Sequence, residues 1–138
     1  MLDDKNKNYN ASILFGCAGF IILLFFMMGF GLIAIMSQER EVARYPGAVP
    51  ISSHSNYMGL PFEFRWDDSY LVRDNFTAVY NWYSIKFDLG AESQANGNCI
   101  QLDGQQEQFL IKRDIIVLVC KTEKGQRVYV SRATAINR

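Results

Sequence analysis

The 24 residues from Ile13 to Met36 carry no charged side chain, and this stretch constrains the fold more than any other part of the chain. At a rise of about 1.5 Å per residue, a helix of this length is about 36 Å long, enough to cross a hydrocarbon core of about 30 Å with some tilt. Backbone polar groups inside lipid must be satisfied within the segment itself. The sequence therefore predicts one transmembrane helix.

The alternative interpretation is a cleavable secretory signal, and three features disfavour it. The apolar run is longer than the roughly 7–15 apolar residues of a signal peptide. The residues before it include Asp3 and Asp4 as well as Lys5 and Lys7, so it lacks a basic leader. Met36 is too large for the residue that precedes a cleavage site. We therefore expect an anchor that is not removed.

The orientation of the span follows from its layout more than from its charges. Lys5 and Lys7 flank one end and Arg40 and Arg44 flank the other, so the count of basic residues is a tie. A short tail before a single span, with a long domain after it, is the usual layout of a signal anchor. We expect a single-pass cell-membrane protein with a cytoplasmic N-terminus and an extracytoplasmic C-terminal domain.

The end of the anchor is marked by Pro46 and Gly47, which disfavour a continuing helix. The good helix formers that begin at Ser37 are expected to carry the helix a turn or two into water, with Tyr45 near the lipid headgroups. The chain is thus divided into a short tail at 1–12, a transmembrane helix at 13–36, a juxtamembrane linker at 37–47 and a soluble domain at 48–138.

One helix is expected in the soluble domain. Asp74 is its expected N-cap, the helix is expected at 75–89, and Gly90 is expected to end it in a left-handed conformation. Its apolar residues recur at i, i+3, i+4, i+7 and i+11, which places them on one face. They are Phe76, Val79, Tyr80, Tyr83 and Phe87.

The remaining patterns predict strands. Phe62, Phe64 and Trp66 alternate with charged residues, which is the period of a half-buried strand. The segment 115–120 is apolar at every position, as expected of a strand covered on both faces. The sum is an α+β domain of ββαβββ type, a small antiparallel sheet with one packed helix. The expected elements are strands at 49–57, 60–67, 99–102, 115–120 and 127–136, a further short strand left open at 109–111, a polar loop at 91–98 and a hairpin loop at 122–126.

Three short motifs, Tyr45–Ala48, Asp67–Ser69 and Val79–Tyr83, carry a family resemblance. In this order they resemble a group of uncharacterised bacterial domains in which a "YPGA" opening and a "DS … WY" helix follow a single membrane span. The resemblance covers residues 45–83. It implies the same anchoring and fold, and it carries over no catalytic residue.

Charge excludes several classes of partner. From Ser37 onward the chain has 12 Lys and Arg and 12 Asp and Glu, since each total of 14 loses two residues in the tail. A neutral domain has no basic stripe for nucleic acid and no polybasic cluster for anionic lipid headgroups. The expected partners are the lipid bilayer and other membrane protein subunits, with no nucleic acid and no identified small-molecule substrate.

Catalytic and metal-binding patterns are sparse. His54 is the only histidine, and no G-x-S-x-G motif accompanies it. Together with two cysteines in the domain it does not supply the clustered ligands of a zinc site. We expect no enzyme activity, no cofactor and no metal. The alternative is a membrane-tethered ligand sensor or small enzyme with a site near His54, Arg65, Asp67 and Asp68.

Two further features bear on function. Cys99 and Cys120 both fall on expected strands, and the sequence leaves open whether they form a disulfide or remain two buried thiols. In the expected helix, Ser12, Gly16 and Gly19 form a small-residue stripe that lets another helix approach closely. We therefore expect a non-catalytic structural or accessory subunit of a membrane complex, with an interaction domain outside the cytoplasm.

Overall fold

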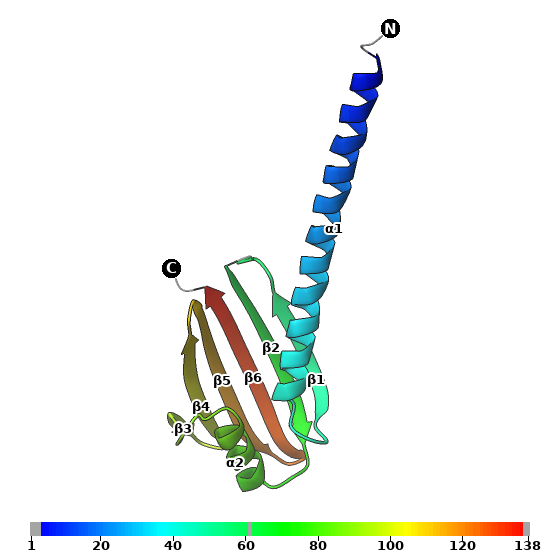
Figure 1. The fold of residues 1–138 in the computed structure, drawn as a ribbon. Helices are drawn as coiled ribbons and strands as arrows, with labels where there is room; N and C mark the ends of the chain where they lie inside the picture. Colours follow the sequence, from blue (N-terminus) through cyan, green and yellow to red (C-terminus); the bar gives the residue numbers. More distant parts are fainter. Residues whose placement is uncertain (1–3, 61, 137–138) are drawn as a thin grey trace. The chain divides into compact units, whose positions relative to one another are not determined.

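The computed structural model describes residues 4–60 and 62–136, with side chains described from Leu14 onward. The chain forms two compact units that divide between Ala43 and Arg44. The first unit is helix α1, and the second, which we call the head, holds the sheet and a second helix (Figure 1).

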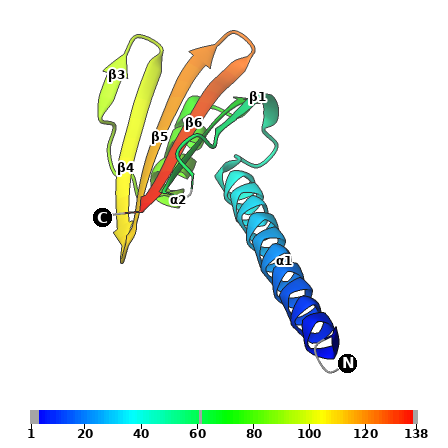
Figure 2. The same ribbon diagram turned by 90° about the horizontal axis from the view of Figure 1, so that it is seen from above.

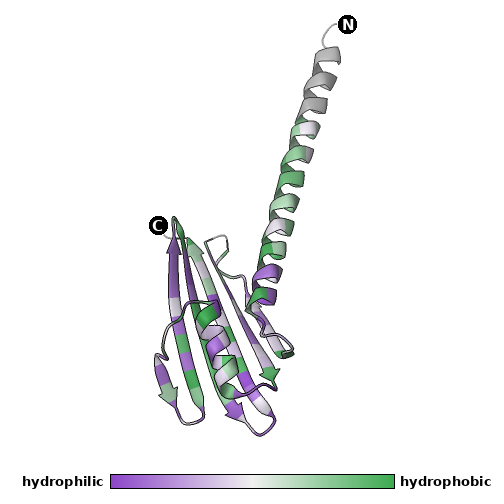
Figure 3. Cartoon of the chain, turned by 60° about the horizontal axis from the view of Figure 1, so that its bottom comes forward, coloured by the Kyte–Doolittle hydropathy of each residue, from purple (hydrophilic) through white to green (hydrophobic). Residues whose placement is uncertain are grey.

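Helix α1, Asp4–Ala43, is 40 residues long. Its stretch Leu14–Ala43 is long and apolar enough to cross a membrane. Figure 3 colours the middle of this helix as hydrophobic on the sides in view, and Phe15 and Phe25 are 80% and 71% exposed. The helix continues beyond Met36 for about two turns, as predicted, and it begins at Asp4, inside the segment described as a tail.

The head is an α+β unit, as predicted, built on one antiparallel sheet with the strand order β1-β2-β6-β5-β4-β3 (Figures 1 and 2). Among the described residues it has six strands and one helix, so the sheet has one strand more than the predicted pattern. The elements of the head are β1 Val49–Asn56, β2 Glu63–Val72, α2 Phe76–Lys86, β3 Gln94–Asn96, β4 Cys99–Gln108, β5 Ile111–Thr122 and β6 Gly125–Ile136.

The core lies between α2 and one face of the sheet, because α2 packs against β5. Val79 and Tyr83 are the buried residues of α2, and both belong to the predicted apolar stripe. On the sheet, Tyr70, Val128 and Val119 occupy one cross-strand row and are also buried. Burial raises the pKa of the Tyr83 phenol well above its usual range.

The N-cap of α2 is Asn75 and not the predicted Asp74. The Asn75 side-chain oxygen accepts the N–H of Ala78 at 2.8 Å, and the helix begins at Phe76. Asp74 instead accepts a hydrogen bond of 2.6 Å from the hydroxyl of Tyr45, a residue 29 positions away. Either side chain suits a cap, so the long-range contact decided between them.

Helix α2 ends at Lys86, three residues before the predicted end. Gly90 is left-handed as predicted, with φ of 71°, but Asp88, with φ of 53°, takes the left-handed position that ends the helix. The N–H of Leu89 then bonds the carbonyl of Ser84 at 2.9 Å, which is the long bond of a Schellman motif. The earlier stop lets the Leu89 side chain turn back into the core, where it is 8% exposed.

The segment 91–98 is not entirely a loop, because β3 forms within it and pairs with β4. Its three residues continue the sheet by one short edge strand. The open edge of β4 supplies the hydrogen-bonding partners, which the polar composition of this segment did not reveal.

Phe109 lies in a turn and not in a strand. Strands β4 and β5 are longer than predicted and pair from Cys99–Cys120 to Gln108–Ile111, so only Phe109 and Leu110 connect them. Phe109 has φ of 59°, a conformation that is usually given to glycine at the first position of a type II′ turn. Its β-favouring side chain suggested a strand, but the hairpin register overrode that preference.

Strand β5 is covered on one face only, which contradicts the prediction of burial on both faces. Ile115, Val117 and Val119 are buried, whereas Ile116 is 42% exposed and Leu118 is half-buried. The head has a single described helix, so no other described element of the head covers the opposite face of the sheet.

Tyr45 is buried in the head at 7% exposure, and its expected place near the lipid headgroups stays a prediction. Its ring lies 5.3 Å from that of Trp82 and 6.5 Å from that of Tyr83, measured between centroids. The carbonyl of Tyr45 accepts the N–H of Ala48 across Pro46 and Gly47, with Gly47 at φ of 75°. This is a type II turn, and it ends the helix as predicted.

We expect Tyr45→Phe to lower the free energy of unfolding by about 1 kcal/mol at pH 7, because it removes the hydrogen bond to Asp74. That hydrogen bond also raises the pKa of Tyr45. The stabilisation is therefore present below the phenol's unfolded pKa of about 10 and is lost as the pH rises above it. Denaturant titrations of both proteins in detergent, at neutral and alkaline pH, should show the difference shrinking.

Tyr80→Phe is the matched control, since the Tyr80 hydroxyl bonds Glu92 at an exposed site. We expect it to cost less than Tyr45→Phe. A wild-type advantage over Tyr45→Phe that persists unchanged above pH 10 contradicts the assigned hydrogen bond.

Candidate functional site

The face of the sheet opposite α2, which we call the open face, is the candidate site in the head. Cross-strand register places His54 of β1 directly opposite Asp67 of β2, and Asp67 opposite Ser131 of β6. Residues opposite each other in an antiparallel pair point to the same side, with Cβ atoms about 5 Å apart. One polar row of three residues thus crosses three strands.

A second row lies beside the first. Ser52 and Ser69 are opposite each other across a register shift in β1, and their hydroxyl oxygens are 2.7 Å apart. Ser69 is 3% exposed. Tyr129 of β6 is the partner of Ser69 on the other side and is 39% exposed. The two rows form the polar half of a shallow depression.

The other half of the depression is apolar and is built by β5. Ile116 and Leu118 lie in the same rows as Ser131 and Tyr129, and Gln101 of β4 follows at the rim. The surface therefore has an apolar half, formed by Ile116 and Leu118, and a polar half that contains His54 and Asp67. Such a surface fits a partner segment that is apolar on one side and hydrogen-bonding on the other.

The structure separates the four residues of the predicted sensor or enzyme site. His54 and Asp67 come together on the open face, and Arg65 lies two positions before Asp67 on the same face. Asp68 is on the covered face, where it is 6% exposed and accepts a 2.9 Å hydrogen bond from the Tyr70 hydroxyl. Adjacent strand residues point to opposite sides, so Asp68 does not join the cluster.

The order of the polar row does not match a catalytic triad. A triad needs the histidine between the nucleophile and the acid, whereas here Asp67 lies between His54 and Ser131. Because β1 is the edge strand of the sheet, none of the described strands lies on the far side of His54. The arrangement suits hydrogen-bonded recognition better than acyl transfer.

Sequence analysis did not single out Tyr129, Ser131, Ile116 or Leu118. For the first two a signal was present, because β6 alternates polar or aromatic residues with buried valines such as Val130. For the β5 pair the signal pointed the other way, since a fully apolar strand indicates burial. Within residues 4–60 and 62–136, no group of three or more histidine, cysteine or acidic side chains could hold a metal ion.

Helix α1 carries the second candidate surface. At Gly16 and Gly19 of the predicted stripe, no atom lies within 4 Å of the place a Cβ would occupy. Packing within the chain therefore does not require glycine at either position. The side chain of Ser12 lies outside the described ones. Sequence analysis missed a second feature, a notch at Gly29. It is lined by Phe25, Phe26, Phe30 and Ile33, and the spacing of Phe25, Gly29 and Ile33 at i, i+4 and i+8 was available as its signal.

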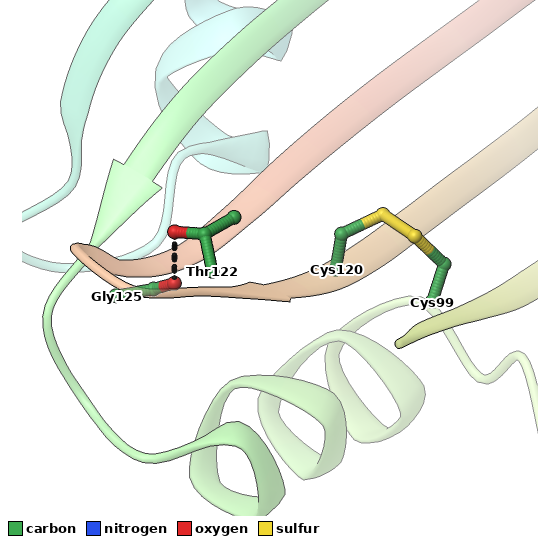
Figure 4. Close-up of a disulfide and its surroundings, with 4 residues drawn as sticks. All are labelled: Cys99, Cys120, Thr122 and Gly125. Atoms are coloured by element: carbon green, nitrogen blue, oxygen red, sulfur yellow. Dashed lines mark hydrogen bonds between the residues drawn. A yellow bond between two sulfur atoms is a disulfide. The ribbon is translucent and has the colours of Figure 1, made fainter. Parts of the chain in front are cut away.

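Cys99 and Cys120 are bonded as a disulfide between directly paired residues of β4 and β5 (Figure 4). Next to it, the Thr122 hydroxyl donates to the carbonyl of Gly125 at 2.6 Å across the β5–β6 turn, the predicted hairpin loop. Cys17 is a free cysteine in α1 and is exposed. The disulfide fixes the register of the strand that supplies the apolar half of the open face.

Comparison with known proteins finds no match: no family model, no curated protein and no solved structure resembles the chain significantly. The resemblance of residues 45–83 to bacterial single-span domains therefore stays a prediction.

We expect the double variant Cys99→Ala/Cys120→Ala to lose about 3 kcal/mol of unfolding free energy, because the disulfide closes a loop with a sequence separation of 21. Guanidinium titration in detergent measures this loss, and Cys17→Ala is the matched control with no expected change in the head. Alkylation of both Cys99 and Cys120 in unfolded, unreduced protein contradicts the bridge.

Proposed function

We propose that this protein is a single-pass, non-catalytic membrane protein that acts as a structural or accessory subunit of a membrane complex. Helix α1 anchors it and docks against a helix of another subunit, and the head binds a partner outside the cytoplasm. The observation that carries the proposal is the apolar helix α1, which is long enough to cross a bilayer and is joined to a folded head.

The surface of α1 supports a docking role. In lipid, helices associate through close packing and not through the hydrophobic effect, so small residues beside bulky ones favour contact. The notch at Gly29 lies between the aromatic rings of Phe25, Phe26 and Phe30, and it has the shape that receives a side chain of a neighbouring helix.

The head supports an interaction role through its open face. Ile116 and Tyr129 stay substantially exposed at the centre of a sheet, next to the polar row of His54 and Asp67. A partner covering this face would bury apolar surface at about 25 cal/mol per Å² and keep hydrogen bonds at its edge. The disulfide supports a location in an oxidising compartment, and hence an extracytoplasmic head.

We expect Gly29→Leu to dissociate the complex, because a leucine side chain fills the notch that receives the neighbouring helix. Gly31→Leu is the matched control: it makes the same chemical change two residues along, on the opposite side of the helix. Blue native electrophoresis of mild-detergent extracts from native membranes should show a large species that Gly29→Leu alone converts to the free chain. Migration of the wild type as the free chain contradicts the proposal.

The second candidate function is a membrane-tethered sensor that binds a small polar ligand on the open face. The juxtaposition of His54 and Asp67 beside the depression favours it. A ligand with both donor and acceptor groups would bond the imidazole and the carboxylate together.

Thermal unfolding of the full chain in detergent, with amino acids and dicarboxylic acids as probes, tests the sensor. We expect a stabilising probe to lose its effect in Asp67→Asn and to keep it in Asp103→Asn, an exposed carboxylate elsewhere on the open face. No shift with any probe, or equal shifts in both variants, argues against this function.

A further inference from the structure

The three two-residue hairpin turns of the sheet differ in chemistry between its two ends. At one end, the two-residue turns are Gly97-Asn98 and Glu123-Lys124, both polar. At the other end, the β4–β5 turn is Phe109-Leu110. These three hairpins have the same turn length and antiparallel pairing, so the apolar turn is not a requirement of the hairpin.

Phe109 has an unfavourable backbone conformation and an unfavourable environment for its side chain. It has φ of 59°, which a large side chain rarely adopts, and it is 97% exposed. Glycine would satisfy the turn without strain and without exposing an aromatic ring. A strained and exposed aromatic residue that adds nothing to the core indicates a role outside the fold.

Phe109 is one part of a wider apolar surface. The pairing of Ile111 with Ile136, and the 2.8 Å bond from the N–H of Ile136 to the carbonyl of Phe62, bring the β1–β2 loop to the same end of the sheet. Met58 in that loop is 95% exposed. We call this surface the apolar end; its residues are Met58, Leu60, Phe62, Phe109, Leu110 and Ile136, all between 42% and 97% exposed.

The geometry points to insertion of the apolar end into the headgroup and acyl boundary of the bilayer that α1 spans, an inference that rests on the proposed anchoring. The polar part of α1, Ser37–Ala43, rises only about 10 Å. Strand β1 has eight residues and is about 26 Å long. The chain enters the head at the opposite end of β1, so the apolar end is tethered within about 36 Å of lipid, the sum of these two lengths, at high effective concentration.

The charges near the apolar end favour apolar insertion over binding to anionic headgroups. The two basic residues Lys112 and Arg113 are outnumbered by Glu63, Glu107 and Asp114. The Lys112 ammonium lies 3.9 Å from the Asp114 carboxylate. Without a net positive patch, the contact should be the same on zwitterionic and anionic membranes.

The test uses the full chain in zwitterionic nanodiscs, with the environment-sensitive dye NBD on single thiols. Leu110→Cys reports the apolar end and Lys124→Cys reports the polar end, each in a Cys17→Ala background with the disulfide intact. Native Cys17 reports the anchor. We expect a blue-shifted emission at position 110 that shallow spin-labelled lipid quenches and aqueous iodide does not. Position 124 should show the reverse.

Two results at position 110 would overturn the inference. Quenching of position 110 by iodide means that the apolar end is in water, and protection from both quenchers means that protein covers it. Quenching of Cys17 by lipid in the same nanodiscs shows that the anchoring holds even if the insertion fails. Replacing part of the lipid with anionic lipid should leave the signals unchanged.

Phe109→Gly separates insertion from folding. It removes the aromatic ring and relieves the backbone strain, so the head should unfold at an equal or higher denaturant concentration. We expect the lipid quenching at position 110 to fall in this variant. Unchanged quenching contradicts a role of Phe109 in lipid contact.

Discussion

The head depends on the burial of one sheet face beneath α2. Helix α2 packs against β5, and Tyr83 and Val79 of the helix are buried, as are the Tyr70, Val128 and Val119 side chains of the sheet. This packing supplies the water-free layer that a sheet needs. Burying a side chain of this size is worth about 1.5–3 kcal/mol, so loss of the contact would remove a large share of a small domain's stability. With a single described helix, only one face can be covered, and the exposure of the other face follows.

The same packing fixes the start of the head. Tyr45 lies against Trp82 and Tyr83 of α2, and its hydroxyl bonds Asp74 just before the helix. The residue that begins the head is thus fixed to the helix that forms the core. A partner that binds the open face and a bilayer that contacts the apolar end would meet the same sheet at different places, so the two interactions need not compete.

Much of the fold could be predicted from local patterns. The 3.6-residue period placed the stripe of α2, and the Pro46-Gly47 pair ended the first helix. Two of the wrong predictions have the same cause, because contacts between residues far apart in sequence decided between conformations that the local sequence allowed. Tyr45 took Asp74 and left the cap to Asn75, and the β4–β5 register placed Phe109 in a turn despite its strand preference. The candidate site was harder, since a row across three strands joins residues that are far apart in sequence.

By itself, the sequence determined that an apolar, bilayer-length helix precedes an α+β head, and that the chain from Ser37 onward has no net charge, because length, charge and periodicity act locally along the chain. Only the tertiary structure decided which apolar residues the core would leave outside. Ile116 and Phe109 are as hydrophobic as their buried neighbours, and nothing in their local sequence marks them as exposed. Burial depends on whether another layer of structure is present to cover a side chain, and that is a property of the assembled sheet.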